Sequence, residues 1–349
     1  MPDVDTPRPP PPPDPVFLAP PRRLNAAGQP RRTGFEFEYA GLDVERSAEL
    51  VRAVFGGDVE VVSPSIRSVR TPLGPFSVEV DSSVIKDQRY RSVLRAVGLE
   101  RAGLDHEPVE RALMGMVANW VPFEIGTPPL PFDQFGRLDD LRRRLLAAGA
   151  QGTRTSARFA FGMHINPELP GDDAGSVRDH LRAFLLLQPW LKGRVDVDLT
   201  RRVMPFINPF PNDYARLVLQ HGYPADLGRL IDDYIAYNPT RNRPLDLLPA
   251  LAHLDAERVM ARVEDPHLVK ARPAYHYRLP NCLVDEPDWS IAREWNTWVA
   301  VERLAADPAR LAAMAGDYLE ADEQSFRPFV DKWPAVLEEY MSEGRKNEG

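Results

Sequence analysis

Residues Thr33 to Ala40 alternate aromatic and acidic side chains, in the order TGFEFEYA. This period of two is typical of a β-strand, in which residues i and i+2 project from the same face. Glu36 and Glu38 therefore lie side by side, and the aromatic residues lie on the opposite face. Adjacent carboxylates repel each other unless a cation lies between them or water screens them. The pattern predicts a sheet with one apolar face, and it leaves a metal site and a solvated acidic surface as equal alternatives for the other.

Composition limits the class of protein. The chain has 349 residues, of which 43% are hydrophobic, so it can bury a sizeable core in one large domain or in two. The formal net charge of −8 gives no basic excess to attract nucleic acid or an anionic membrane. No run of about 18 apolar residues is present, so we expect no membrane span. The single cysteine, Cys282, excludes intrachain disulfides and cysteine-cluster metal sites.

Proline is concentrated at the N-terminus, where ten of the 36 prolines lie in the first 21 residues. Proline fixes φ and lacks an N–H donor, which favours an extended polyproline arm. The segment lacks the basic start and apolar middle of a secretory signal, so a cytoplasmic location is expected. We predict a disordered arm over residues 1–31, a single domain over 32–343 with a proline-rich insertion at about 192–252, and a disordered tail over 344–349.

The rest of the chain mixes strands and helices without regular βαβ spacing. This favours an α+β fold with a largely antiparallel sheet over a doubly wound parallel sheet. Further strands are expected at 59–62, 66–70, 76–80, 119–126, 157–166 and 275–279. Helices are expected from Asp43 or Ser47 to Phe55, closed by two glycines, and at 108–117, 137–148 and 175–187, with mostly helical structure from Trp289.

Several other segments carry polar groups that suit metal binding. Asp81 and Ser83 end one predicted strand, and Glu124 lies inside an apolar strand, where an unpaired charge would be unfavourable. His164 and Asn166 share one strand face, although a lone histidine is more often structural. Oxygen ligands with one imidazole suit Mg²⁺ or Mn²⁺ better than a dedicated zinc site.

The common phosphate-binding and hydrolase motifs are missing. The sequence contains no GxxxxGK[ST], GxGxxG, HExxH or GxSxG, which disfavours P-loop, Rossmann, zincin and α/β-hydrolase sites. Near the end of the predicted sheet, His276 and Arg278 share one strand face, and Arg272 lies close by in sequence. The planar guanidinium of Arg278 can hold a phosphate, although a surface salt bridge explains it equally well.

Five segments, taken in order, resemble the amidoligase family of the glutamine synthetase and glutamate–cysteine ligase superfamily of carboxylate–amine ligases. They are GFEFEY at 34–39, VEVDSS at 78–83, PFEIGTPPL at 122–130, FGMHIN at 161–166 and YHYRLPN at 275–281. A weaker match is RNRPLDLLPAL at 241–251. The resemblance implies a glutamine synthetase-like curved antiparallel sheet, with divalent cations and ATP on its inner face and helices packed behind.

The resemblance also implies roles for individual residues. It assigns metal binding to Glu36, Glu38, Glu124, His164 and His276. Asp81 and Ser83 match an active-site segment, and Arg278, with Arg272 nearby, matches the arginine that binds the transferring phosphate. Relatives usually carry Glu-x-Arg in the last strand, whereas this chain carries His276 before Arg278. An imidazole can ligate metal but brings no negative charge, which implies weaker binding or loss of one cation.

The activity implied is an ATP- and Mg²⁺- (or Mn²⁺-) dependent carboxylate–amine ligase acting on a small amino acid, amine or peptide. ATP would convert the carboxylate to an acyl phosphate, and the amine would then displace phosphate, with Asp81 accepting a proton. The alternatives are a non-catalytic nucleotide-binding or assembly protein and a guanidino-kinase-like phosphotransferase. Family analogy further implies a glutamine-amidotransferase-like or cyclotransferase-like pathway partner.

Overall fold

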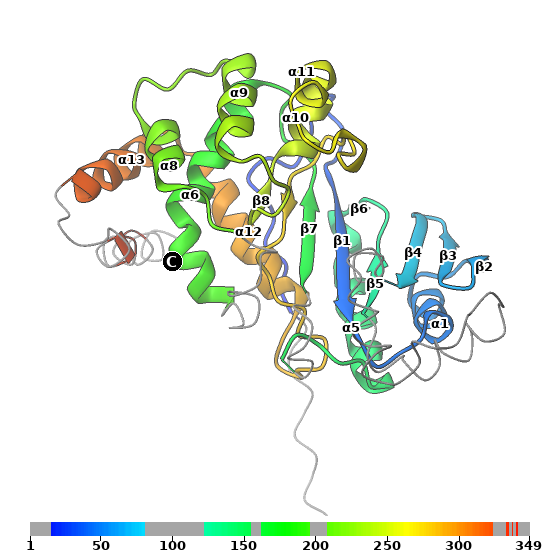
Figure 1. Ribbon diagram of the computed structural model, residues 1–349. Helices are drawn as coiled ribbons and strands as arrows, with labels where there is room; N and C mark the ends of the chain where they lie inside the picture. The colour runs from blue at the N-terminus through cyan, green and yellow to red at the C-terminus, as the bar shows by residue number, and fades with distance from the viewer. Residues whose placement is uncertain are drawn as a thin grey trace, which may run out of the picture.

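The computed structural model describes residues 15–80, 122–154, 162–195, 208–323, 333, 334, 337 and 340. Within these residues, nine strands form one sheet in the order β2-β3-β4-β5-β1-β7-β9-β8, with β6 also paired to β1 (Figure 1). Every strand pair is antiparallel. The prediction of an α+β fold built on a largely antiparallel sheet is therefore confirmed.

The strands are β1 (Arg32–Tyr39), β2 (Asp58–Ser63), β3 (Ile66–Thr71), β4 (Gly74–Val80), β5 (Phe123–Gly126), β6 (Leu130–Pro131), β7 (Met163–Pro167), β8 (Leu245–Asp246) and β9 (His276–Tyr277). The strand predicted over 275–279 is real but only two residues long. Part of the strands predicted at 119–126 and 157–166, and the whole helix predicted at 108–117, lie outside the described residues.

The helices are α1 (Val44–Phe55), α5 (Gly136–Ala148), α6 (Ala174–Val195), α8 (Asn212–Leu219), α9 (Leu227–Tyr237), α10 (Leu248–Leu254), α11 (Ala256–Met260), α12 (Ile291–Ala305) and α13 (Pro308–Glu323). Two short 3₁₀ helices are also present, η1 (Phe132–Gln134) and η2 (Pro266–Leu268). Among the described residues, no helix is both long enough and apolar enough to cross a bilayer. The region expected as an insertion at 192–252 supplies the edge strand β8.

Helices α1, α5 and α12 cover the apolar face of the sheet (Figure 1). The ring of Phe35 in β1 meets Phe135, at the start of α5, edge to face with centroids 5.1 Å apart. Tyr277 of β9 packs on Trp298 of α12 at 5.4 Å. Aromatic pairs in this geometry add to the free energy gained by burying apolar surface. The helices therefore cover the aromatic face of β1. Because side chains alternate along a strand, the residues between the aromatic ones project from the other face.

Helix α1 begins after Asp43, the first of the two caps that the sequence offers, and ends at Phe55 as predicted. The side chain of Asp43 accepts a hydrogen bond from the backbone N–H of Arg46 (2.7 Å), which satisfies one donor of the first turn. Gly56, with φ of 74°, receives the end of the helix, and its N–H donates to the carbonyl of Arg52. Gly57 follows with φ of 87° and turns the chain into β2.

We expect Gly57→Ala to destabilise the protein much more than Gly56→Ala does. Both positions have positive φ, which disfavours a Cβ by about 1–2 kcal/mol. A Cβ on Gly57 would also overlap the carbonyl of Arg70 in β3, whereas one on Gly56 would meet no atom within 4 Å. Overpacking of this kind adds about 1–3 kcal/mol. Denaturant titration of both variants measures the difference, and equal losses would show that the contact with β3 does not constrain the turn.

Helix α6 is longer than the predicted range of 175–187, because it continues through Pro189 to Val195. Pro189 lacks the N–H that would donate to the carbonyl of Leu185, four residues earlier, which weakens the helix at this turn. The indole N–H of Trp333 donates to the carbonyl of the adjacent Leu186 at 2.9 Å. This contact comes from a distant segment, and the local sequence around Pro189 cannot reveal it.

The N-terminal boundary of the folded part lies earlier than predicted. Residues 1–14 lie outside the described residues, but residues 15–31 lie against the domain. The indole of Trp295 donates to the carbonyl of Leu18 at 2.8 Å. Arg31 forms an ion pair with Glu302 of α12 at 2.7 Å, and both side chains are buried. The prediction of a disordered arm over all of 1–31 is therefore wrong for its second half, which is held by buried polar contacts with α12.

Candidate metal centre

The face of the sheet that no described helix covers carries two neighbouring rows of polar residues. Directly opposed residues of antiparallel strands project from the same face, with Cβ atoms about 4.5–5.5 Å apart. In one row, Glu36 of β1 lies opposite His164 of β7. In the other row, Glu124 of β5 lies between Glu38 of β1 and Glu79 of β4. The alternation in β1 therefore places both of its glutamates on the face away from the helices.

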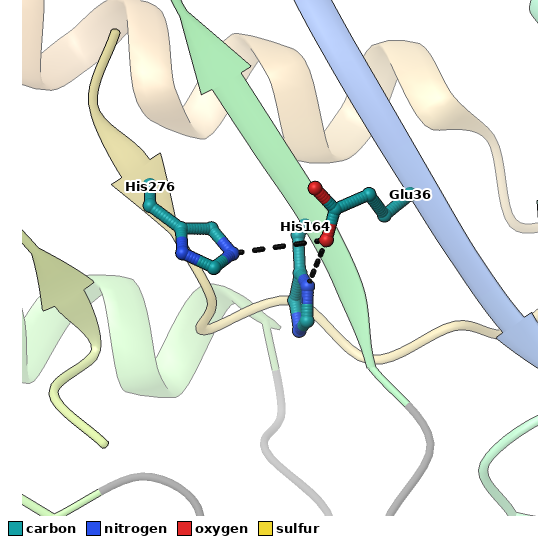
Figure 2. Close-up of side chains that lie close together, drawn as sticks. All are labelled: Glu36, His164 and His276. Atoms are coloured by element: carbon teal, nitrogen blue, oxygen red, sulfur yellow. Dashed lines mark hydrogen bonds and ion pairs between the residues drawn. The ribbon is translucent and has the colours of Figure 1, made fainter. Parts of the chain in front are cut away.

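Glu36, His164 and His276 converge from β1, β7 and β9 (Figure 2). The Nδ1 atom of His164 lies 2.7 Å from Oε2 of Glu36, and Nε2 of His276 lies 3.8 Å from the same oxygen. One ligand atom from each residue can be chosen so that all three lie within 4.8 Å of one another. The side chain of Glu36 is 19% exposed, while those of His164 and His276 are 9% and 7% exposed. The cluster is thus a nearly buried set of two imidazoles and one carboxylate.

Neighbouring groups orient the two glutamates of β1. The amide of Asn166 donates to Oε1 of Glu36 at 2.8 Å. The backbone N–H of Gly162 donates to Oε2 of Glu38 at 2.6 Å, and Oε1 of Glu38 lies 3.6 Å from Nε2 of His164. His164 therefore lies between the two carboxylates, and each carboxylate has one oxygen held by an amide group.

The electrostatics of the cluster favour its metal-binding protonation state. Burial alone would raise the pKa of Glu36, but the hydrogen bond with His164 and the proximity of the His276 imidazole outweigh it, and the pKa lies well below the ordinary value. The pKa of His164 is lowered to about 4, mainly by burial and in part by the nearby charge of Arg278, against the opposing effect of Glu36. At neutral pH the site therefore presents a carboxylate and, at His164, a neutral imidazole, the forms that ligate metal.

The other residues predicted for the site have different positions in the structure. Glu124 is next to the cluster in the second polar row. In the antiparallel pair of β7 and β9, Ile165 lies opposite Tyr277, so the next residues along, His164 and Arg278, also lie opposite each other. The Nη1 atom of Arg278 donates a hydrogen bond to the carbonyl of Arg241 at 3.0 Å. The backbone N–H of Arg272 bonds the carbonyl of Pro249, and the structure does not join its side chain to the cluster. Asp81 and Ser83 lie outside the described residues.

Two residues beside the cluster were missed in the sequence. Glu79 lies opposite Glu124, and the alternation of the SVEV segment in β4 could have placed it on the polar face. Asp246 of β8 lies opposite His276 of β9, with its Oδ2 atom 3.7 Å from Nδ1 of that histidine. No local periodicity indicates Asp246, because β8 and β9 are each two residues long; the weak family match over 241–251 is the sequence signal that includes it.

The cluster fits a divalent cation. Both ring nitrogens of His276 are buried without a hydrogen-bond partner, although buried polar atoms are almost always hydrogen-bonded. Nε2 of His276 points toward the carboxylate of Glu36 (Figure 2). An imidazole nitrogen that faces a carboxylate in this way can donate its lone pair to a metal ion held between the two groups. The arrangement can hold such an ion beside the second row of carboxylates.

Comparison with known proteins gives a match to a protein family. A family model described as "putative amidoligase enzyme" matches residues 29–300. This range covers most of the chain and includes every strand of the sheet and all the residues of the cluster. No curated protein and no solved structure matches the chain significantly.

Proposed function

The chain belongs to the amidoligase family, and on this premise we propose that it is an ATP- and Mg²⁺-dependent ligase that joins a carboxylate to an amine through an acyl phosphate. Family membership supports a ligase-type enzyme in general. The finer assignment, including a glutamine synthetase-like arrangement of the sheet and a small amino acid, amine or peptide as substrate, is our proposal.

One observation carries it: Glu36, His164 and His276 come from three different strands and converge on the face of the sheet that no described helix covers. Residues that ligate metal from separate strands meet only if the tertiary fold brings them together. The neighbouring row of Glu38, Glu124 and Glu79 adds oxygen donors beside the cluster. Oxygen donors are the ligands that Mg²⁺ prefers, and ATP is bound by enzymes as its Mg²⁺ complex.

The chain's own residues then have distinct tasks. A cation held here would neutralise charge on the phosphates during transfer. Glu36 and His164 supply ligands already in their metal-binding protonation states. The guanidinium of Arg278, next to His164 in the extended register, supplies a fixed positive charge for the transferring phosphoryl group. No covalent protein nucleophile is required, because ATP itself activates the carboxylate.

The family resemblance adds three further residues to the proposal. Asp81, which follows β4 in the sequence, is proposed to accept a proton from the attacking amine. Ser83 and Arg272 are proposed to contact ATP. A glutamine-amidotransferase-like or cyclotransferase-like pathway partner remains a proposal of the same kind.

Isotope transfer tests the reaction directly. The full chain is incubated with ATP, Mg²⁺, pools of amino acids and amines, and carboxylate substrates labelled with ¹⁸O. Formation of an acyl phosphate joins a carboxylate oxygen to the γ-phosphorus, and attack by the amine releases phosphate that keeps this oxygen. We therefore expect one ¹⁸O atom in the released phosphate for each amide formed, measured by mass spectrometry.

Two other outcomes would contradict the proposal. A phosphorylated product with no labelled phosphate would indicate a phosphotransferase of the guanidino-kinase kind. Tight nucleotide binding with no ADP across the whole panel would indicate a non-catalytic protein on the same fold. Reactions without an amine serve as the control, because they permit phosphorylation of the carboxylate but no amide formation.

A further inference from the structure

The donor atoms of the cluster differ from those of a typical magnesium site. Mg²⁺ prefers six oxygen ligands, several of them water, whereas imidazole suits Zn²⁺ and other first-row transition ions. Glu36, His164 and His276 offer two imidazoles and one carboxylate. The row of Glu38, Glu124 and Glu79, by contrast, offers only oxygen. The two ends of the polar face therefore favour different cations.

Asp246 gives His276 the support that metal-binding histidines usually have. Its side chain is fully buried, and Oδ1 accepts the backbone N–H of Leu248 at 3.0 Å. Its other oxygen, Oδ2, has no hydrogen-bond partner and lies 3.7 Å from Nδ1 of His276, which has none either. A metal-bound histidine commonly donates its second ring N–H to a carboxylate, which fixes the tautomer and strengthens the ligand. The arrangement places the two unpartnered atoms side by side, with Nε2 of His276 directed at Glu36.

Arg241 is a second basic group that the described residues place beside Asp246. Its Nε lies 3.9 Å from Oδ2 of Asp246 and also lacks a hydrogen-bond partner. The side chain of Arg241 is 36% exposed, whereas that of His276 is 7% exposed. Water can therefore solvate part of the guanidinium of Arg241, whereas the imidazole of His276 is enclosed between Asp246 and Glu36. This difference favours a structural pairing of Asp246 with His276.

We propose that Glu36, His164 and His276 bind a transition-metal ion of the Zn²⁺ class in preference to Mg²⁺, and that Asp246 is a positioning residue that holds His276 as a ligand. The inference rests on the proposed function only in assigning this metal to the ligase site. In that site, Mg²⁺ would accompany ATP at the carboxylate row, and the transition metal would occupy the imidazole end.

Metal affinity of the full chain, measured without ATP or substrate, tests the first part. The protein is stripped with a chelator and titrated with Zn²⁺, Co²⁺ and Mg²⁺ by calorimetry and by competition with a coloured chelator. We expect Zn²⁺ and Co²⁺ to bind at least a hundredfold more tightly than Mg²⁺. His276→Glu should lower this ratio at least tenfold, because it replaces an imidazole by a hard oxygen donor. His267→Gln, at an exposed histidine of η2, should leave the ratio unchanged.

Asp246→Asn tests the positioning role, since an asparagine keeps the acceptor for Leu248 but removes the negative charge. We expect Co²⁺ affinity to fall about 10–100-fold, the visible absorption of bound Co²⁺ to shift, and Mg²⁺ binding to stay the same. If this variant does not fold, ¹⁵N NMR of the Zn²⁺-loaded wild-type protein gives the answer. The proton of His276 should lie on Nδ1 and the metal on Nε2.

The outcomes separate the two proposals. Equal affinity for Mg²⁺ and Zn²⁺, or a His276→Glu variant with an unchanged ratio, would overturn the metal preference while amide formation could still be observed. A metal bound at Nδ1 of His276, or a Co²⁺ spectrum that Asp246→Asn does not alter, would overturn the role of Asp246. Tight Zn²⁺ binding in a protein that never forms an amide would support the metal site and contradict the proposed ligase.

Discussion

Glu36→Gln is expected to abolish divalent metal binding at the cluster and to lower the rate of amide formation about a thousandfold. Glu36 is the residue that both histidines approach, with distances of 2.7 and 3.8 Å to one of its oxygens. A glutamine keeps the size of the side chain but removes the negative charge on which a cation depends. Metal-based charge stabilisation is worth several kcal/mol, and each 1.4 kcal/mol corresponds to about one power of ten in rate.

The control for this variant is Glu49→Gln, on the exposed surface of α1, where the carboxylate pairs with Arg52 in the same helix. It should leave both metal affinity and amide formation unchanged. Calorimetric titration with Co²⁺ and the isotope assay give the two readings for each variant. If Glu36→Gln retained wild-type metal affinity while remaining folded, the cluster would not be the metal centre.

Arg31→Met is expected to destabilise the folded state by about 3–5 kcal/mol, because it leaves the charge of Glu302 buried without its partner. The guanidinium of Arg31 makes a two-pronged pair with this carboxylate, with both contacts at 2.7 Å. The side chains of Arg31 and Glu302 are only 5% and 1% exposed. The indole of Trp298 also donates to Glu302, so the carboxylate is fixed in α12 and cannot turn to the solvent.

A double variant separates loss of the pair from loss of packing. Arg31→Met combined with Glu302→Gln removes both charges and keeps an acceptor for Trp298, so it should recover much of the lost stability. Arg52→Met, which breaks an exposed pair, should change the free energy of unfolding by less than about 1 kcal/mol. Denaturant titrations of the four proteins measure these values. Similar effects of Arg31→Met and Arg52→Met would show that residues 15–31 contribute little to the fold.

Local patterns predicted the parts of this protein that depend on neighbours in sequence. The alternation in β1 indicated which face would carry Glu36 and Glu38, and capping residues indicated both ends of α1. These features follow from strand geometry and from helix termini, which the sequence displays directly. The residues matched by family resemblance extended the prediction to His164 and His276, which the structure brings together with Glu36.

The features that could not be predicted depend on contacts between distant segments. The pairing of β8 with β9, which brings Asp246 beside His276, involves two strands too short to show a pattern. The high proline content of the N-terminal region led us to place Arg31 in a disordered arm. Its ordered position depends on Glu302, a partner 271 residues later. In both cases the interaction joins two buried ionisable groups that are far apart in the sequence. Neither the amino-acid composition nor the periodicity of hydrophobic residues can indicate such a pair.

The wide spacing of the three ligands along the chain has a consequence during protein synthesis. Glu36 and His164 are 128 residues apart, and His276 lies on the last strand to be made. A ribosome releases residues in order from the N-terminus, so the first two ligands emerge long before the third. The growing polypeptide cannot bring the three proposed ligands together until β9 has left the exit tunnel and closed against β7. Translation order would thereby delay binding of the proposed metal until nearly all of the described sheet has been synthesised.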